Sequence, residues 1–505
     1  MTLNFMNIFG NDLKIIFPET FLTIAILWLL VFGVTHNTDS NKVLLSKIVS
    51  WLSIQTIFFT LLLVYNNPFT STVFLKNLFI SDYLTTFITI VLLLCSLASI
   101  LISLDYLKDE KMNAFEYTIL ILLATLGMVL IVASYDFLSM YLAIELQSLT
   151  LYILATFQRN SEFSTEAGLK YFILGAFSSG VLLFGCSMVY GFTGTTNFGD
   201  LAKLITGITS TSTSFISTSG IIIGLIFIAT ALFFKLAAAP FHMWAPDVYE
   251  GAPTSVTAFF AITPKIAILG VFLRLFFYTF YDLIDQWQPM IIFCAIVSMI
   301  IASLGALAQV RLKRLLAYSA IGHVGFILIG LSTGTTLGIQ SVLLYIVLYI
   351  IMVINMFGVV LSLREQSEGN SGSSTMIQYI SEFSNLHKTN PLLAITIAVA
   401  LFSMAGIPPL AGFYSKLYIF LSAIESNMYL VAIIGVLTSV LGSVYYIRII
   451  KIMYFENTEN YTYYKPMSLE SSLVVSITSF LILFFFLYPN PLFIITHKAA
   501  LTLCM

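Results

Sequence analysis

The chain has 505 residues, of which 59% are apolar and only 9% are charged, and its net charge is −2. Because an average soluble domain carries about 25% charged residues, this composition excludes a soluble globular protein and predicts one polytopic membrane unit. The near-zero charge offers no basic surface for nucleic acid, and no polar stretch is long enough to form a catalytic domain.

Apolar runs of about 20 residues with few charges, the length that crosses a bilayer, recur along the whole chain. We expect fourteen such spans and therefore an all-α polytopic membrane protein. Their expected positions are 13–34, 43–65, 82–104, 115–133, 137–157, 168–192, 217–239, 254–279, 288–308, 314–331, 338–362, 391–424, 429–455 and 469–488. Two polar connections, at 206–219 and 366–375, are expected to be flexible linkers.

The distribution of Lys and Arg predicts how these spans are oriented. Loops that follow odd-numbered spans contain 13 of the 22 basic residues, whereas the opposite side, which includes Arg274, contains five. The positive-inside rule describes this asymmetry, so both termini are expected to face outward. The other four basic residues fall inside the predicted spans: Lys170, Lys235, Lys265 and Lys416.

A lysine at the centre of a membrane helix costs about 2.5–3.5 kcal/mol, so each of these four needs hydration, a partner or a role in proton transfer. Glu145, in the middle of the fifth span, lies deep inside an apolar run and is the expected partner. Such a pair can change protonation when its separation changes. The alternatives are a fixed buried ion pair that selects helix register and, for Lys170, a side chain that extends to the membrane surface.

Helix-breaking residues accompany two of the lysines. Pro240 follows Lys235 by five residues, and the segment GIPPLAG precedes Lys416. We predict that helices 7 and 12 are broken at these points, because unwound backbone at membrane depth is tolerated where it is buried or lines a water-filled cavity. Each break is expected to bring freed carbonyls near a lysine. A proline kink that only aids packing is the alternative.

The two breaks lie five spans apart, and because five is an odd number of crossings, they predict two inverted five-helix repeats. The expected divisions are 1–110 for an N-terminal three-helix segment, 111–285 for helices 4–8, 286–460 for helices 9–13 and 461–505 for helix 14. Lys265 lies in the middle of helix 8, and His323 lies in helix 10, which corresponds to the helix of Glu145. An intramembrane histidine can relay protons, although a neutral packing histidine fits the sequence equally well.

The four cysteines are isolated in the sequence, at Cys95, Cys186, Cys294 and Cys504. Without a C-x-x-C pair or a cluster, they do not match the spacing of Fe–S, structural zinc or disulfide frameworks. We therefore expect no metal, redox group or other cofactor on this chain. The N-terminal segment lacks the features of a signal or transit peptide, so the first apolar helix is expected to be retained.

Five motifs carry a resemblance to a known family: SYDFLSMYLAIELQSLTLYIL, EAGLKYFILGAFSSG, FKLAAAPFHMWAPDVYEGAP, LKRLLAYSAIGHVGF and AGIPPLAGFYSKLYIF. Over roughly residues 80–460, the chain resembles the antiporter-like membrane subunits of respiratory complex I, and among these the mitochondrial subunit 2 and bacterial subunit N group. The resemblance implies that Glu145, Lys235, Lys265 and Lys416 are the glutamate of helix 5 and the lysines of helices 7, 8 and 12 of that family. With Lys170 and His323, they form the set of candidate catalytic residues.

The resemblance also implies a function and a setting. It implies a proton-translocating subunit of NADH:ubiquinone reductase that performs no redox chemistry itself, with flavin, Fe–S clusters and quinone in partner subunits. The expected partners are other membrane-arm subunits, including further antiporter-like ones, and lipids. The expected location is the mitochondrial inner membrane, with both termini on the intermembrane-space side. A free-standing cation/proton antiporter is the alternative, and a scaffold whose charges no longer move protons is a third.

Overall fold

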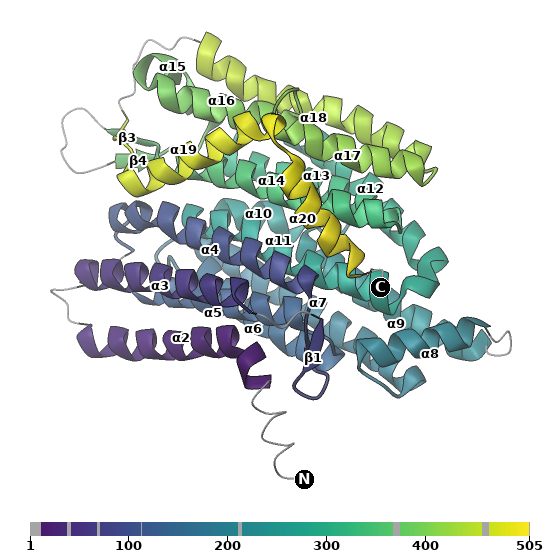
Figure 1. The fold of residues 1–505 in the computed structure, drawn as a ribbon. Coiled ribbons are helices and arrows are strands. Elements are labelled where there is room, and N and C mark those ends of the chain that lie inside the picture. Colours follow the sequence, from purple (N-terminus) through teal and green to yellow (C-terminus); the bar gives the residue numbers. More distant parts are fainter. Residues whose placement is uncertain are drawn as a thin grey trace.

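The computed structural model describes residues 12–37, 42–67, 71–112, 114–210, 215–366, 374–456 and 464–503. In these ranges the chain is a bundle of long helices whose axes run in roughly one direction (Figure 1). Helices dominate because a segment in hydrocarbon must satisfy its backbone hydrogen bonds internally. Thirteen of the described helices are long and apolar enough to cross a membrane, and the halves α16 (Pro391–Ala405) and α17 (Ala411–Glu425) form a further crossing. The prediction of fourteen spans is confirmed.

The first three crossings form an N-terminal segment. They are α2 (Phe17–His36), α3 (Lys42–Tyr65) and α4 (Tyr83–Asp109). A short antiparallel hairpin, β1 (Thr72–Phe74) with β2 (Phe79–Ser81), joins α3 to α4. Asp82 begins α4 with a capping box, because its carboxylate accepts from the backbone N–H of Thr85 at 2.7 Å and the Thr85 hydroxyl accepts from the backbone N–H of Asp82 at 2.8 Å.

The next ten crossings fall into two successive sets of five. The first set is α5 (Glu116–Ala133), α6 (Phe137–Ala155), α7 (Glu162–Thr193), the pair α9 (Phe215–Leu236) and α10 (Trp244–Gly251), and α11 (Thr254–Arg274). The second is α12 (Ile284–Leu307), α13 (Leu312–Ser332), α14 (Thr336–Ser362), the pair α16–α17, and α18 (Tyr429–Phe455). The fourth crossing of each set is broken, which confirms both predicted interruptions. Superposition of the two sets by a rotation about an axis in the membrane plane stays a prediction.

The described ends of the two polar connections belong to helices and strands. Residues 206–210 end helix α8 (Phe198–Ser210), and α9 begins at Phe215. Serine and threonine fit into helices when their hydroxyls bond to a carbonyl of the preceding turn, as Thr206 does with the carbonyl of Lys203 at 2.7 Å. In the second connection, β3 (Arg364–Gln366) pairs with β4 (Ser374–Met376). Residues 211–214 and 367–373 lie outside the described residues.

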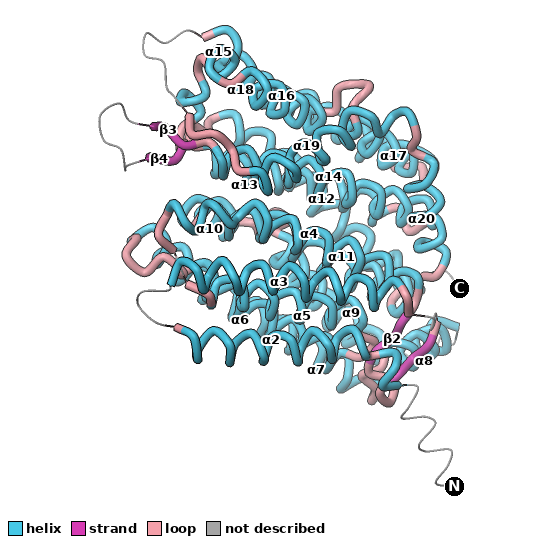
Figure 2. The backbone as a smooth tube through the Cα atoms, turned by 60° about the vertical axis from the view of Figure 1, so that its left-hand side comes forward, coloured by secondary structure: helices cyan, strands magenta, loops and turns pink. Residues whose placement is uncertain are grey.

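The remaining elements lie at the two ends of the bundle. The β1–β2 and β3–β4 hairpins lie at opposite ends (Figure 2), which we call the outer and the inner end. Two short helices follow β4 and precede α16 in the chain. They are Ile380–Phe383 and α15 (Leu386–Thr389). The last crossing is α19 (Leu469–Phe484), followed by α20 (Asn490–Leu501). The start of α2 and the end of α20 both lie at the outer end, as an even number of crossings requires.

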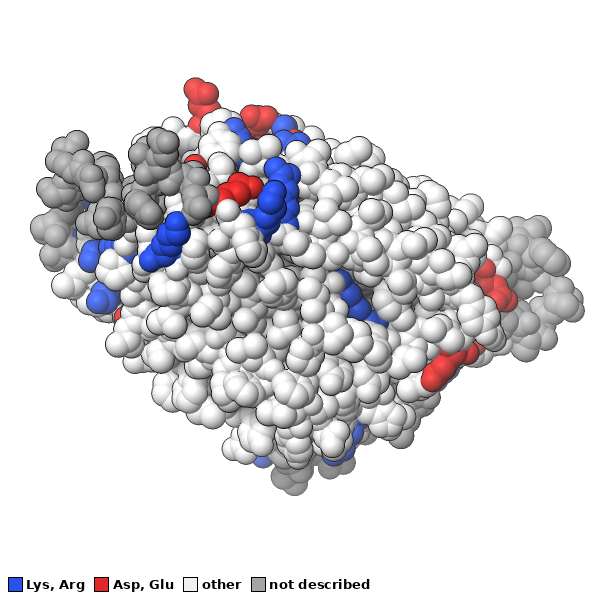
Figure 3. Space-filling model, turned by 90° about the horizontal axis from the view of Figure 1, so that it is seen from above, with Lys and Arg blue, Asp and Glu red and all other residues white. Residues whose placement is uncertain are grey.

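Charged side chains are concentrated at the same two ends of the bundle. Figure 3 shows one lateral face, on which they gather toward the two ends and leave a broad uncharged belt between them. A basic side chain is visible in a hollow of that belt. This pattern is the one expected for a multi-pass membrane protein, with ionisable groups at membrane depth confined to the interior or to a cavity.

Candidate functional site

The break in helix 7 places Lys235 next to α6. The turn after α9 includes Ala237 with a φ of 60°, an uncommon conformation for a residue with a side chain. The amine of Lys235 donates to the Tyr152 hydroxyl at 3.5 Å and lies 5.9 Å from the centre of that ring. One helical turn along α6, the hydroxyl of Ser148 donates to a carboxylate oxygen of Glu145 at 3.5 Å. Tyr152 and Ser148 therefore lie between the half-buried lysine and the half-buried glutamate.

Glu145 and Lys235 do not form a direct ion pair among the described residues, and one carboxylate oxygen of Glu145 is buried without a hydrogen-bond partner. A fixed ion pair that only selects helix register would place the two charges in contact. Instead, each charge contacts a hydroxyl, Tyr152 for Lys235 and Ser148 for Glu145.

The break in helix 12 holds Lys416 in a different way. Lys416 is 8% exposed, and its amine donates to the carbonyls of Met404 and Ala405 at 3.0 and 2.9 Å. These carbonyls belong to the last turn of α16, where four backbone acceptors lack intrahelical partners and the helix dipole favours a cation. The expected freed carbonyls are therefore present at Lys416.

Gly406 makes this contact possible. Its φ is 88°, in the region that favours glycine, and a β-carbon there would lie 3.0 Å from Cδ and 3.3 Å from the amine of Lys416. We expect Gly406→Ala to displace the lysine from the two carbonyls, to lower proton pumping, and to destabilise the turn by about 1–3 kcal/mol. Pumping by the reconstituted complex measures this effect.

Gly180→Ala is the matched control for that substitution. Gly180 lies in α7, and no atom of the described residues lies within 4 Å of an added β-carbon. The control should retain pumping. Equal losses for both variants would contradict a specific role for Gly406.

Lys265 and His323 meet at a tyrosine of α14. Lys265 is 6% exposed, and its amine has no hydrogen-bond partner among the described residues. The amine lies 5.7 Å from the ring centre of Tyr349, and that ring lies 4.8 Å from the imidazole of His323. Tyr345, one turn away on α14, forms a 2.6 Å hydrogen bond with Nδ1 of His323.

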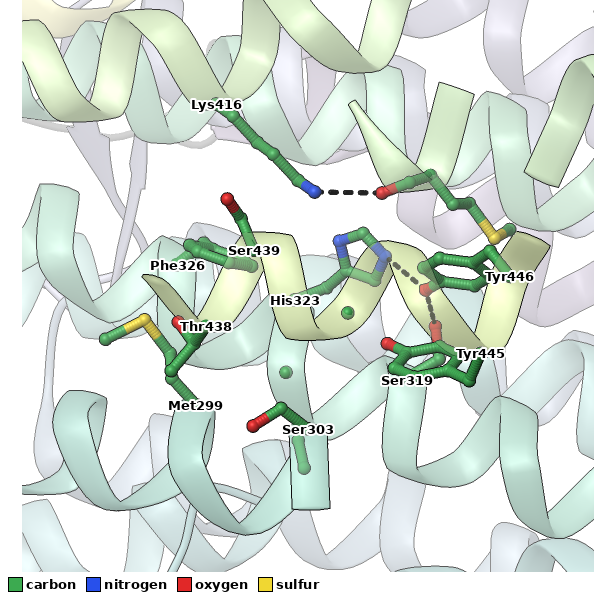
Figure 4. Close-up of a pocket in the computed structure, with 14 residues that line it drawn as sticks. Met299, Ser303, Ser319, His323, Phe326, Lys416, Thr438, Ser439, Tyr445 and Tyr446 are labelled. Carbon is green, nitrogen blue, oxygen red and sulfur yellow. Dashed lines mark hydrogen bonds between the residues drawn. The ribbon is translucent and has the colours of Figure 1, made fainter. Parts of the chain in front are cut away.

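A cavity of about 20 Å³ joins His323 to Lys416. Figure 4 shows both side chains at this cavity, with a chain of hydrogen bonds from His323 through the Tyr446 hydroxyl to Ser319. The bond from Nε2 of His323 to Tyr446 is 3.3 Å long. Since one buried water needs about 10–15 Å³ and two to four polar partners, the cavity has the size and lining to hold a water molecule between the imidazole and the amine.

The structure thus forms two clusters of candidate residues, Glu145 with Lys235 and Lys265 with His323 and Lys416. Lys170 belongs to neither. Its side chain is 41% exposed and pairs with Asp247 at 3.0 Å, because it starts near the inner end of α7 and reaches a carboxylate of α10. A role of Lys170 in proton transfer stays a prediction, and its exposure fits the alternative of a side chain that extends to the membrane surface.

Lys170 is part of an ion-pair cluster that joins α7, α10 and α13 at the inner end. Arg311 pairs with Glu250, and Arg314 lies 3.6 Å from Asp247. The hydrogen bond from Arg311 to Glu250 raises the pKa of the guanidinium, so this pair stays ionised. The cluster fixes the second half of broken helix 7 to the start of the helix that carries His323.

Sequence reasoning missed two sets of residues near the site. Arg274 was assigned to an aqueous loop, but it is buried and its Nη2 donates to both carboxylate oxygens of Asp82 at 3.0 and 2.8 Å. The tyrosine partners were missed as well. The spacing of Tyr345 and Tyr349 by four residues, which places them on one face of a helix, is the signal that could have indicated them.

Among the described residues, no group of three or more His, Cys, Asp or Glu side chains could hold a metal ion. The polar groups of the two clusters are amines, hydroxyls, one imidazole and one carboxylate. These are groups that transfer protons rather than electrons.

A family model described as "NADH:quinone oxidoreductase/Mrp antiporter, TM" matches residues 134–442. The chain belongs to this family of antiporter-like membrane proteins. It is 52% identical to NADH-ubiquinone oxidoreductase chain 2 of Marchantia polymorpha, over 98% of this chain and all of the relative. It is 45% identical to NADH-quinone oxidoreductase subunit N of Paramagnetospirillum magneticum, over 97% of each chain.

Solved structures agree with this assignment. A chain of respiratory complex I from Thermus thermophilus with bound aureothin is 26% identical and has a TM-score of 0.77, over 94% of this chain and 98% of that one. A chain of the Mrp complex from Dietzia sp. shares the fold with a TM-score of 0.80 at 20% identity, over 97% of this chain and 98% of that one.

Proposed function

We propose that this chain is a proton-translocating membrane subunit of NADH:ubiquinone reductase, respiratory complex I. The full-length likeness to chain 2 and subunit N supports membership of that complex. The observation that supports proton translocation is the placement of a lysine at each of two helix breaks, above all the buried Lys416 on the freed carbonyls of α16. Flavin, Fe–S clusters and quinone would then act in partner subunits, and other antiporter-like subunits would lie beside this one.

In this proposal, protons move between the groups of the two clusters: Glu145, Lys235, Lys265, His323 and Lys416. The separation between neighbouring groups is bridged by tyrosine hydroxyls and by water. A polar group alone in hydrocarbon costs several kcal/mol, and a shared hydrated path relieves this cost for all five groups together. Charge at one end of the path also alters the protonation of the next group, because interactions at low effective dielectric weaken slowly with distance.

The proposed location is the mitochondrial inner membrane with both termini on the intermembrane-space side. The excess of Lys and Arg in the loops after odd-numbered spans supports this orientation. Proteolysis of an N-terminal tag in intact and in inside-out membrane vesicles would test it. Cleavage only in the inside-out vesicles would contradict the orientation.

Purification from mild detergent tests complex membership against the alternative of a free-standing antiporter. We expect an affinity-tagged chain to elute with a very large assembly that contains flavin and Fe–S absorbance, because a chain with no redox group needs partners that supply the driving force. Elution of a homogeneous, active chain at its own mass of 56.2 kDa would favour the antiporter.

A further inference from the structure

A second cavity lies at the inner end of the bundle, away from both lysine clusters. Its volume is about 190 Å³, and it lies between the ends of α4 and α14 and the start of α19. Its polar lining consists mainly of Asp105, Asp109, Arg364, Lys465, Ser468 and Ser471. Because one water needs only about 10–15 Å³, this cavity can hold a small organic group.

Arg364 is the most deeply buried charge at this cavity. Its side chain is 2% exposed, and it forms ion pairs with Asp109 at 3.5 Å and with Glu110 at 3.0 Å. Its Nη1 is buried and has no hydrogen-bond partner among the described residues. Burying a charged donor without an acceptor costs free energy. A ligand in the cavity would supply this acceptor to the guanidinium of Arg364.

Further donors lie at the start of α19, on the same cavity. The Ser468 hydroxyl caps this helix by accepting from the backbone N–H of Ser471 at 3.4 Å, and it also donates to the Ser471 hydroxyl at 3.2 Å. The free N–H groups of a first helical turn and the helix dipole favour an anionic group such as a phosphate. With the unpaired nitrogen of Arg364, this end of the cavity matches a phosphate.

The carboxylates that line the cavity favour a ligand with a cationic group. Lys465 donates to both carboxylate oxygens of Asp109 at 2.9 Å, which leaves this carboxylate neutralised. Asp105 lines the cavity without an ion pair among the described residues. With Glu110, which pairs with Arg364, three acidic residues face the two basic ones, so the cavity favours a ligand that carries a cation beside its phosphate over a purely anionic one. A primary ammonium can donate hydrogen bonds to Asp105, whereas a trimethylammonium cannot.

Apolar side chains also line the cavity and favour a ligand with an apolar part. Ile102, Leu361 and Met467 also line the cavity, and it lies where the transmembrane helices end, at the depth of lipid headgroups. Leu473 and Ile477 of α19 are exposed beyond it, toward the middle of the membrane. We infer that the cavity binds the phosphoethanolamine headgroup of a phospholipid, with the phosphate at Arg364 and Ser471, the ammonium at Asp105, and the acyl chains along α19.

Asp105→Asn tests this site in the intact complex. The substitution preserves shape, removes the charge that holds the ammonium, and leaves the Arg364 ion pairs in place. Detergent-washed complex is incubated with micelles that contain equal amounts of phosphatidylethanolamine and phosphatidylglycerol, and the bound lipids are counted by mass spectrometry per flavin. We expect about tenfold weaker retention of one phosphatidylethanolamine, the effect of losing one charge-assisted hydrogen bond.

Glu456→Gln is the matched control, because Glu456 is a half-exposed acid at the same end that pairs only with Lys451 at 3.7 Å. It should retain phosphatidylethanolamine as the wild type does. Ser471→Ala is the second variant, directed at the phosphate, and should weaken retention of both lipids. Equal phosphatidylethanolamine retention by wild type, Asp105→Asn and Ser471→Ala overturns the inference.

A competition experiment on the wild-type complex distinguishes a lipid from a free solute. Inorganic phosphate or free phosphoethanolamine at millimolar concentration should not displace the lipid, since neither gains the apolar contacts of the acyl chains with α19. Displacement by either solute, or a cryo-EM map of the intact complex that shows only water in this cavity, overturns the inference. A headgroup density that continues into two acyl chains along α19 supports it.

Discussion

Replacement of Lys235 by alanine is expected to lower coupled NADH:quinone activity about 100-fold, the low end of what removal of a proton-transfer group costs. Assembly should be largely unaffected. Removing a lysine at membrane depth relieves a desolvation penalty, and among the described residues no direct ion pair with Glu145 is broken. Activity and proton-pumping stoichiometry are measured on purified complex reconstituted into vesicles, and assembly is measured on native gels.

Lys235→Arg separates charge from proton exchange. Arginine retains the positive charge but does not deprotonate in proteins, so a relay should fail with arginine as it fails with alanine. Lys203→Ala is the control, since Lys203 is an exposed lysine of α8. Full pumping by an assembled Lys235→Ala complex would contradict a relay through this residue and would favour the scaffold alternative. Full pumping by Lys235→Arg would show that only the charge matters.

The breaks in helices 7 and 12 were predictable because they depend on local chemistry. Pro240 and the GIPPLAG segment cannot continue a helix, and an apolar run of that length still has to cross the membrane. What each lysine contacts was less predictable. Lys416 reaches the carbonyls of its break, as expected, but Lys235 does not. The carbonyl of Phe234, next to Lys235, instead accepts a hydrogen bond from the indole N–H of Trp244 at 2.9 Å.

The partners of His323 and Lys265 could not be predicted because they depend on how each helix is rotated about its axis. Helices that are apolar all round have no periodic pattern that fixes this rotation. Tyr345 and Tyr349 reveal a polar face of α14 by their spacing, but the sequence does not say which helix that face meets. Lys170 shows the converse: it lies within an apolar run, yet its position near the start of α7 brings its amine to Asp247 at the inner end.

An ion pair links the cluster of Glu145 and Lys235 to the cluster of Lys265, His323 and Lys416. Arg311 and Glu250 tie α10, whose break adjoins Lys235, to α13, which carries His323. If a change of charge at Lys235 displaces α10, the ion pair would therefore shift α13 and with it His323. No continuous chain of hydrogen bonds between the two clusters is needed for this effect. Coupling of this kind needs an element with two arrangements, and α10, a short half-helix tied by ion pairs to both α7 and α13, is the part of the first five crossings that would transmit the displacement.

The outer end of α11 is expected to be the most sensitive point of the fold. Arg274 and Asp82 are 4% and 11% exposed, and their ion pair joins α11 to the start of α4. Arg274→Met should destabilise the chain by about 3–5 kcal/mol, because it leaves the carboxylate of Asp82 buried and uncompensated. The expected result is a large loss of assembled complex on native gels and a lower temperature of thermal inactivation.

Removing both charges should reverse most of this loss. Asp82→Asn in the Arg274→Met background eliminates the stranded charge while the amide oxygen can still cap α4. Lys451→Met is the control, since Lys451 and Glu456 are exposed and such pairs contribute about 0–1 kcal/mol. If the double variant assembles no better than Arg274→Met, the charge pair is not the cause of the defect. The packing of the long arginine stem against α4 would then be what holds the outer end of the Lys265 helix in place.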